Sequence, residues 1–166
     1  ENIIHKGLAS VKNGAFTFSF VVPKDISYNL GKGKIIYYAK SNELDAHGAF
    51  SNFVIGSNSD EIVIDNSGPE IELFLDSRDF VSGGKTSKSP TLLAFLSDEN
   101  GINTVGNGIG HDITAVLDND YSNVIVLNNF YQSNLDDFTS GKISYPFQNL
   151  APGLHILKLK AWDVAN

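Results

Sequence analysis

Hydrophobic and polar residues alternate along most of this 166-residue chain, which is the pattern of β-strands that bury one face. The clearest example is Ala15–Val22. It places an aromatic row on one face of the strand: Phe16, Phe18 and Phe20. Asn13-Gly14 stands just before this segment and suits a tight turn, because both residues tolerate positive φ angles. The pattern therefore predicts a hairpin that pairs Ala15–Val22 with Ile3–Val11.

Shorter strands are expected in the rest of the first part of the chain. β-branched and aromatic residues, which favour strands, predict them at Lys34–Lys40, Ala49–Gly56 and Glu61–Ile64. The polar segment Ser41–Gly48 predicts a turn between the first two. Turn-forming residues then cluster at Asp65–Pro69. This cluster predicts a boundary between a β-sandwich domain at 1–66 and a second domain at 67–166.

The second part of the chain predicts six strands and no helix. They are expected at Glu70–Asp76, Thr91–Leu96, Asp112–Leu117, Asn123–Leu127, Lys142–Phe147 and Leu154–Trp162. This spacing is typical of an immunoglobulin-like sandwich, which usually has seven strands, so the last edge strand is expected beyond Asn166. The predicted fold is thus all-β, with two consecutive antiparallel β-sandwich domains.

One long loop, Ser97–Asp112, interrupts this alternation. Loops of this length without secondary structure of their own are uncommon and often functional. Its glycine run resembles a dinucleotide-binding fingerprint but fails it, because His111 stands where the last glycine is needed and no helix follows. The glycines are better explained by a folded loop that packs apolar residues against the sandwich end. Those residues are Ile102, Val105 and Ile109.

Composition narrows the classes of function. The formal charge of −7 argues against nucleic acid or an anionic membrane as a partner, since both are bound mainly through lysine and arginine. No cysteine is present, so the chain has neither a thiolate nucleophile nor a zinc-thiolate site. No apolar window is long enough for a transmembrane segment. No signal peptide precedes Glu1, and the chain starts without methionine, so it is interpreted as a piece of a longer protein.

Catalytic motifs are missing from the sequence. His111-Asp112 could be a base and the group that orients it, but no nucleophile is positioned beside them. The serine-hydrolase pattern G-x-S-x-G does not occur. His155 alternates in phase with Leu157 and Leu159, which predicts that it fills or rims the core. No catalytic residue is therefore assigned.

Acidic residues gather near the predicted strand ends, where oxygen ligands for calcium are often found. They are Asp98, Glu99, Asp112, Asp118, Asp120 and Asp163. Asp118-Asn119-Asp120 begins like a calcium loop but lacks the glycine and the distant glutamate of that motif. Two interpretations stay open: Asp118 and Asp120 are weak calcium candidates, or these acids are ordinary solvated turn residues.

Three stretches carry a resemblance to a known family. They are Asp65-Asn-Ser-Gly-Pro-Glu-Ile-Glu-Leu-Phe-Leu75, then Ser97–Asp118 with its Asp-Glu-Asn-Gly-Ile-Asn and Gly-Asn-Gly-Ile-Gly-His-Asp-Ile words, and Leu150-Ala-Pro-Gly-Leu-His-Ile-Leu-Lys-Leu-Lys-Ala-Trp-Asp-Val-Ala-Asn166. Together they resemble the region C-terminal to the peptidase domain in gingipain-type cysteine peptidases that serve as type IX secretion sortases in Bacteroidetes. The likeness covers 65–166 well. Residues 1–64 are similar, in less distinctive words, to the β-domain that comes before this region.

The resemblance implies a parent protein at the outer membrane or cell surface, or in the periplasm, of a Gram-negative bacterium. Such a parent removes the C-terminal signal domain of secreted cargo and joins the cargo to a surface lipopolysaccharide. The catalytic Cys and His of the family belong to the upstream peptidase domain, so this chain is expected to be a non-catalytic scaffold or docking module. Expected partners are that peptidase domain, cargo signal domains and other secretion components, and no cofactor other than calcium is considered. The expected docking residues are Asp98, Glu99, Asn100, Asn103, His111 and Asp112.

A second hypothesis is a carbohydrate-binding or adhesive β-sandwich at the cell surface. Exposed aromatic rings would then form a platform on which sugar rings stack. The candidates for such a platform are Tyr121, Tyr131 and Trp162. Packing against an edge of the sandwich is the competing explanation for Trp162.

Overall fold

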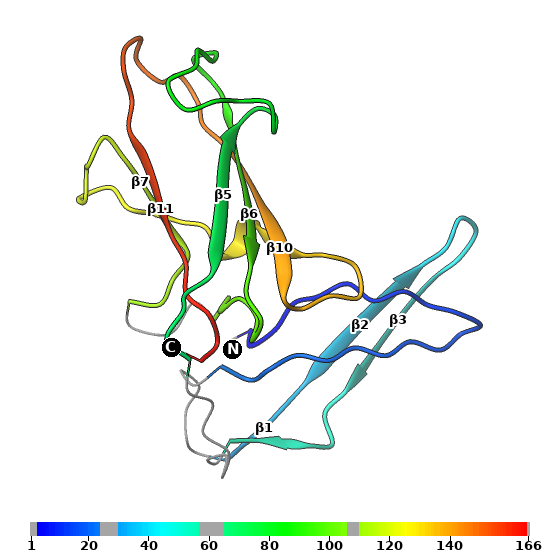
Figure 1. Ribbon diagram of the computed structural model, residues 1–166. Coiled ribbons are helices and arrows are strands. Elements are labelled where there is room, and N and C mark those ends of the chain that lie inside the picture. Colours follow the sequence, from blue (N-terminus) through cyan, green and yellow to red (C-terminus); the bar gives the residue numbers. More distant parts are fainter. Residues whose placement is uncertain (1–2, 24–29, 57–64, 106–109, 166) are drawn as a thin grey trace.

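The computed structural model describes residues 3–23, 30–56, 65–105 and 110–165 (Figure 1). These residues form strands, loops and one short 3-10 helix, η1 (Asn128–Phe130), so the all-β class is confirmed. No helix in the described ranges is long and apolar enough to cross a membrane. The predicted strand Glu61–Ile64 and the loop residues 106–109 lie outside the described residues.

A four-stranded antiparallel sheet forms one layer of the sandwich. Its order is β5 (Glu70–Leu75), β6 (Thr91–Ser97), β10 (Ser140–Pro146) and β9 (Tyr131–Ser133). The two central strands, β6 and β10, pair along seven residues each. Residues of β6 alternate between buried and half-buried, as the period-two pattern predicts.

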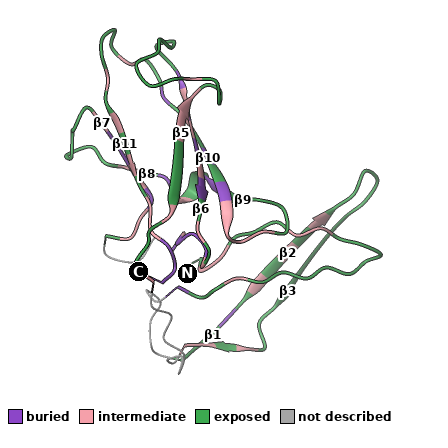
Figure 2. Ribbon diagram, in the orientation of Figure 1, coloured by how far each residue is buried: buried purple, intermediate pink, exposed green. Residues whose placement is uncertain are grey.

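A three-stranded antiparallel sheet forms the second layer. Its order is β11 (Leu157–Lys160), β7 (Thr114–Leu117) and β8 (Ile125–Val126). Apolar side chains from both sheets meet between the layers in one hydrophobic core. Its buried members are Leu92, Ala94, Leu96, Ile102, Ile113, Ala115, Leu127, Tyr131, Ile143 and Phe147. Figure 2 shows the buried positions concentrated in this part of the chain.

The number of strands differs from the six predicted for this part. The described residues 65–105 and 110–165 contain seven, because β9 was not predicted. The count of six strands is therefore wrong, and an edge strand beyond Asn166 stays a prediction. Strand β9 has three residues and lies at an edge, so its sequence is too short to show a period of two. The last strand, β11, pairs with β7 and not with β10, whereas an immunoglobulin constant domain has its last strand beside the sixth.

The first part of the chain forms two small sheets. One pairs β1 (Gly31–Lys32) with β4 (Val54–Ile55), and the other is a hairpin of β2 (Ile35–Lys40) and β3 (Asp45–Phe50). The predicted turn Ser41–Gly48 is too long, because β3 already begins at Asp45. Ser41 closes the shorter turn: its hydroxyl accepts hydrogen bonds from the amides of Glu43 and Leu44. Whether residues 1–66 are a separate sandwich domain stays a prediction.

The strand predicted at Ala15–Val22 is not formed. The turn at Asn13-Gly14 is present, with φ angles of 52° and 79°, and Lys12 bridges to Ala15. Residues 16–22, however, belong to no described strand. The aromatic row exists, with neighbouring ring centroids 6.4 Å and 6.3 Å apart, but no described strand offers this segment a hydrogen-bonded ladder. The period of two correctly predicted that the aromatic rings share one face. A β-strand, however, also needs a hydrogen-bonded partner strand.

Candidate functional site

The first half of the long loop is held against the end of the chain. The amide of Asn103 donates to the carbonyl oxygen of Trp162 (2.8 Å), and the amide of Val164 donates to the carbonyl oxygen of Gly101 (3.0 Å). Ile102 and Val105 are buried, which confirms the predicted packing for these two residues. The loop is therefore an ordered part of the sandwich end over 98–105, and the packing predicted for Ile109 lies outside the described residues.

The predicted docking residues of this loop differ in how far they reach the surface. Glu99 is exposed, and Asp98 and Asn100 are half-buried. Asn103 is fully buried, and its side-chain oxygen accepts a hydrogen bond from the amide of Val105, so its position is that of a structural residue. His111 and Asp112 are half-buried on the far side of the loop, and the His111 ring lies 4.6 Å from that of Trp162. Docking through these residues stays a prediction.

Three carboxylates from distant parts of the chain converge beside this loop. Asp65 comes from the predicted boundary segment, Asp98 follows β6, and Asp163 follows β11. Each offers a carboxylate oxygen, and these atoms lie within 4.8 Å of one another. Asp163 is fully buried, and the other two are half-buried. We call these residues the acidic triad.

Hydrogen bonds hold each member of the triad in place. The side-chain amide of Asn100 donates to Asp65 (2.6 Å), and the backbone amide of Asn100 donates to Asp98 (2.8 Å). The amide of Ala165 donates to Asp163 (2.6 Å). Asn100, a residue of the long loop, therefore bridges Asp65 and Asp98.

Electrostatics within the triad act most strongly on Asp98. Burial raises the pKa of this carboxyl, and the negative charges of Asp163 and Asp65 raise it further. The pKa of Asp65 is lowered instead, chiefly because its carboxylate accepts the backbone amide of Ser67. Close carboxylates that repel one another are also the type of oxygen grouping that hard cations such as Ca²⁺ bind.

Sequence reasoning did not assemble this triad. Asp98 and Asp163 were noted separately as acids near strand ends, and Asp65 was interpreted only as part of a linker. Tertiary pairing of the loop with the C-terminal segment brings the three together. The available signal is an aspartate five residues before β5, in a segment that also carries the family resemblance.

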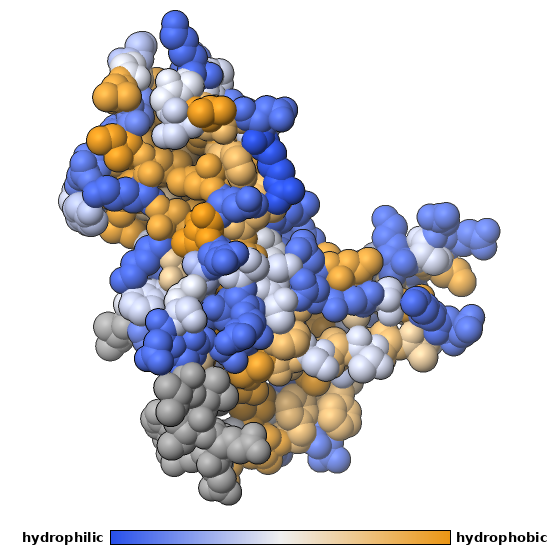
Figure 3. Space-filling model, viewed as in Figure 1, coloured by the Kyte–Doolittle hydropathy of each residue, from blue (hydrophilic) through white to orange (hydrophobic). Residues whose placement is uncertain are grey.

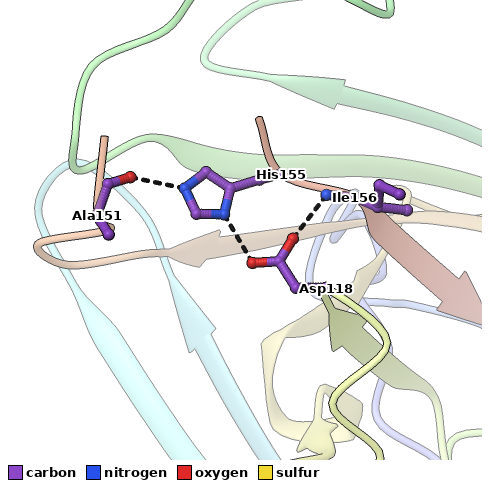
Figure 4. A network of polar contacts seen from close by, with 4 residues as sticks. All are labelled: Asp118, Ala151, His155 and Ile156. Carbon is purple, nitrogen blue, oxygen red and sulfur yellow. Dashed lines mark hydrogen bonds and ion pairs between the residues drawn. The ribbon is translucent and has the colours of Figure 1, made fainter. Parts of the chain in front are cut away.

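The weak calcium candidates, Asp118 and Asp120, hold two neighbouring turns and do not converge on one point. Asp118 accepts the amide of Ile156 (2.8 Å) and contacts His155 Nδ1 (2.7 Å), while His155 Nε2 lies 2.7 Å from the carbonyl oxygen of Ala151 (Figure 4). The hydrogen bond to the Ala151 carbonyl, followed by the one to Asp118, raises the pKa of His155. The hydrogen bond from the Ile156 amide, followed by the one from His155, lowers the pKa of Asp118. His155 is half-buried, and its place at the rim of the core stays a prediction.

Asp120 accepts hydrogen bonds from the side chains and amides of its own turn. The amide of Ser122 donates to one carboxylate oxygen at 3.1 Å, and the side chain of Asn123 donates to the other at 2.5 Å. These bonds lower the pKa of Asp120, with the Ser122 hydroxyl as the largest cause. Asp118 and Asp120 thus each stabilise a turn through hydrogen bonds, and calcium binding stays a prediction.

The aromatic platform of the carbohydrate hypothesis is not assembled. Tyr121 is exposed, but Tyr131 is only 7% exposed and belongs to the hydrophobic core. Trp162 is half-buried, with the Lys160 ammonium 4.1 Å from its ring centroid and His111 on its side. The proposal that Tyr131 stacks on a sugar is therefore wrong, because its ring has no accessible face.

Comparison with known proteins shows a likeness to a solved structure. No protein-family model matches this chain, and no curated protein matches it. Among solved structures, the chain is similar to dimeric latent PorU from Porphyromonas gingivalis, with 37% sequence identity and a TM-score of 0.61. The likeness covers 94% of this chain and 15% of the PorU chain.

Proposed function

We propose that this chain, which is similar to the C-terminal region of PorU, is a non-catalytic β-sandwich scaffold or docking module of a gingipain-type cysteine peptidase. The parent protein would be a sortase that processes the C-terminal signals of type IX secreted proteins. The observation that carries the proposal is the 37% identity over 94% of the chain, a level at which related proteins share more than a fold. The lack of cysteine fits a module whose peptidase nucleophile lies elsewhere.

The docking surface of this module is the exposed part of the long loop. Glu99 projects from the loop, while the residues around it are fixed by the acidic triad and by bonds to the C-terminal segment. A surface held rigidly in this way loses little conformational entropy when a partner binds. The partners in this proposal are the upstream peptidase domain and the C-terminal signal domains of cargo. The location that follows is extracytoplasmic, at the outer membrane or in the periplasm.

The test uses the full-length parent protein with Glu99→Lys and His111→Ala combined. We expect cargo processing to fall about tenfold, because a few residues carry most of the energy of an interface. The melting temperature should fall by no more than a few degrees, because Glu99 is exposed and His111 is only half-buried beside Trp162. Glu43→Lys, in the exposed β2–β3 turn, is the matched control for the charge change and should process cargo normally.

Two results would contradict the proposal. Unchanged cargo processing by the double variant would mean that the loop is not the docking surface. Peptidase turnover by the isolated chain, without any added domain, would remove the non-catalytic role. Binding on a glycan array that is lost on Tyr121→Ala would instead favour the carbohydrate hypothesis.

A further inference from the structure

A large apolar groove lies between the first part of the chain and the sandwich. Its volume is about 1120 Å³. One wall is the aromatic row at Phe16–Phe20, another is β2, and Val105 and Phe138 contribute from the sandwich side. Figure 3 shows hydrophobic side chains gathered around β1 and β2, below the sandwich. Phe16 and Phe18 are 43% and 39% exposed although they face apolar neighbours, so the groove is open to an occupant.

Backbone edges border this groove as well as side chains. Five consecutive residues of β2, Ile35–Ala39, line it, and so do five consecutive residues at Phe16–Phe20. Successive side chains of a strand point to opposite faces, so a run of consecutive lining residues brings the backbone itself to the cavity. Among the described residues, strand β2 pairs only with β3, and residues 16–22 join no described ladder. Both walls therefore offer amide and carbonyl groups that an added strand can pair.

The charges on the groove walls are uneven. Three lysines line it, Lys6, Lys32 and Lys34, and within the described residues none of them forms a salt bridge. Two aspartates also line it, and both accept hydrogen bonds. Asp136 accepts the amide and hydroxyl of Ser10, and Asp137 accepts the hydroxyls of Thr139 and Ser140. The three lysines outnumber the two aspartates, so the lining residues carry a net positive charge.

We propose that this groove binds an extended peptide segment of a partner protein, in which apolar residues alternate with acidic ones, and that the segment adds to the free edge of β2 as a strand. Alternation places the apolar side chains on the aromatic wall and the carboxylates toward the lysine rim. An extended peptide matches both the apolar wall and the unpaired backbone groups, whereas a lipid chain or an aromatic small molecule would leave those groups unpaired. The groove shares Val105 with the long loop but none of the predicted docking residues, so the inference goes beyond the proposed function.

The experiment measures peptide binding to the intact chain by isothermal titration calorimetry. The probe is a capped peptide of about six to eight residues, a common strand length, that alternates valine with glutamate. One control peptide carries lysine in place of glutamate. A second keeps the acidic sequence but is N-methylated at alternate amides on the edge that would pair with β2. We expect saturable one-to-one binding of the acidic peptide and at least tenfold weaker binding of both controls.

A charge-reversed protein tests the lysine rim without touching the apolar wall. In Lys32→Glu/Lys34→Glu both substituted residues are exposed, so the fold should persist, which circular dichroism checks. We expect the preference to reverse, with the lysine peptide now binding about tenfold better than the acidic one. Lys85→Glu/Lys88→Glu changes the net charge equally, away from the groove, and should bind like the unmodified chain.

Three outcomes would overturn the inference. Equal binding of all three peptides would indicate non-specific hydrophobic adsorption. Absence of acidic-peptide binding would remove the site. If the groove instead mediates self-association, the chain will be dimeric by light scattering, Lys32→Glu/Lys34→Glu will be monomeric, and no peptide will bind. None of these results involves Glu99 or His111, so they test the groove independently of the proposed docking loop.

Discussion

The carboxyl group of Asp98 lies where burial and two neighbouring carboxylates oppose its ionisation. Its pKa in the folded protein is higher than in the unfolded chain, so the folded protein binds this proton more readily. The resulting penalty on stability is full above the folded-state pKa and disappears below the unfolded value. Ionised Asp98 therefore destabilises the protein at neutral pH, and protonation removes that cost as pH falls.

Asp98→Asn is expected to raise the melting temperature at pH 7 by about 2–4 °C, the shift for about 1 kcal/mol in a chain of this size. An asparagine oxygen still accepts the amide of Asn100, so only the charge is lost. The gain should shrink as pH falls toward 4. Thermal melts of both proteins between pH 4 and 8 in the presence of chelator measure this difference, and a lower melting temperature for the variant at pH 7 would contradict it.

The same pair of proteins tests calcium binding at the acidic triad, a site separate from the calcium candidates Asp118 and Asp120. Calcium at the acidic triad would raise the melting temperature of the unmodified chain, the effect would disappear with chelator, and Asp98→Asn would weaken it. An unchanged melting temperature at millimolar calcium would remove the prediction.

His155 makes a second dependence on pH of the same sign, because its pKa is also raised in the folded protein. Both of its ring nitrogens face acceptors, the Ala151 carbonyl and the Asp118 carboxylate, and a ring can donate to both only when it is protonated. Its raised pKa means that the stabilisation is complete below the unfolded value near 6.5 and is lost as pH rises through the folded-state pKa. We expect the melting temperature of the unmodified chain to fall by a few degrees between pH 6 and 8.

His155→Gln should remove most of that slope, because glutamine carries no titrating proton in this range. His47→Gln, an exposed substitution on β3, is the control and should keep the slope. Equal slopes for the unmodified chain and His155→Gln would assign the pH dependence to other groups.

At the scale of elements, the edge pairing of β9 with β10 depends on one glycine. A Cβ atom at Gly141 would lie 2.4 Å from the ring end of Tyr131 and 2.6 Å from the carbonyl oxygen of Gln132. Tyr131 is buried and cannot move aside without opening the core. Gly141 therefore allows the core tyrosine and the edge strand to occupy the same layer.

Gly141→Ala is expected to lower the free energy of unfolding by about 1–3 kcal/mol or more, the cost of overpacking a core. Chemical denaturation followed by Trp162 fluorescence measures it. Gly48→Ala on β3 is the matched control, because nothing lies within 4 Å of its added Cβ, and it should change stability by no more than about 1 kcal/mol. A similar loss in both variants would mean that strand entropy, and not the Tyr131 contact, sets the cost.

At the scale of the whole molecule, the hydrophobic core belongs to one part of the chain. Apart from Pro23, Gly33 and Pro90, the buried apolar residues in the described ranges fall between Leu92 and Ala165. The first part contributes two small sheets and the groove, and it contacts the sandwich through a few bonds such as that from Ser10 to Asp136. The domain boundary near residue 66 stays a prediction, but the distribution of the core indicates where folding stability lies.

The fragment 67–166 is expected to unfold cooperatively by itself, because it contains every element of both sandwich sheets. The fragment 1–66 is expected to show no sharp transition, since the described residues in it bury too little apolar surface to offset conformational entropy. Circular dichroism melts of the two fragments and the whole chain make the comparison. A sharp transition in 1–66 alone would instead support an independent first domain.

The sequence by itself determined the all-β class, the faces of the main strands and the packing of Ile102 and Val105, because side-chain periodicity is a local property of the backbone. It also carried the family likeness. Tertiary structure alone decided which strands are paired, and so it removed the ladder expected at Ala15–Val22 and placed Tyr131 in the core. It also brought Asp65 to Asp98 and Asp163, since contacts between distant segments depend on chain topology, which no local pattern records.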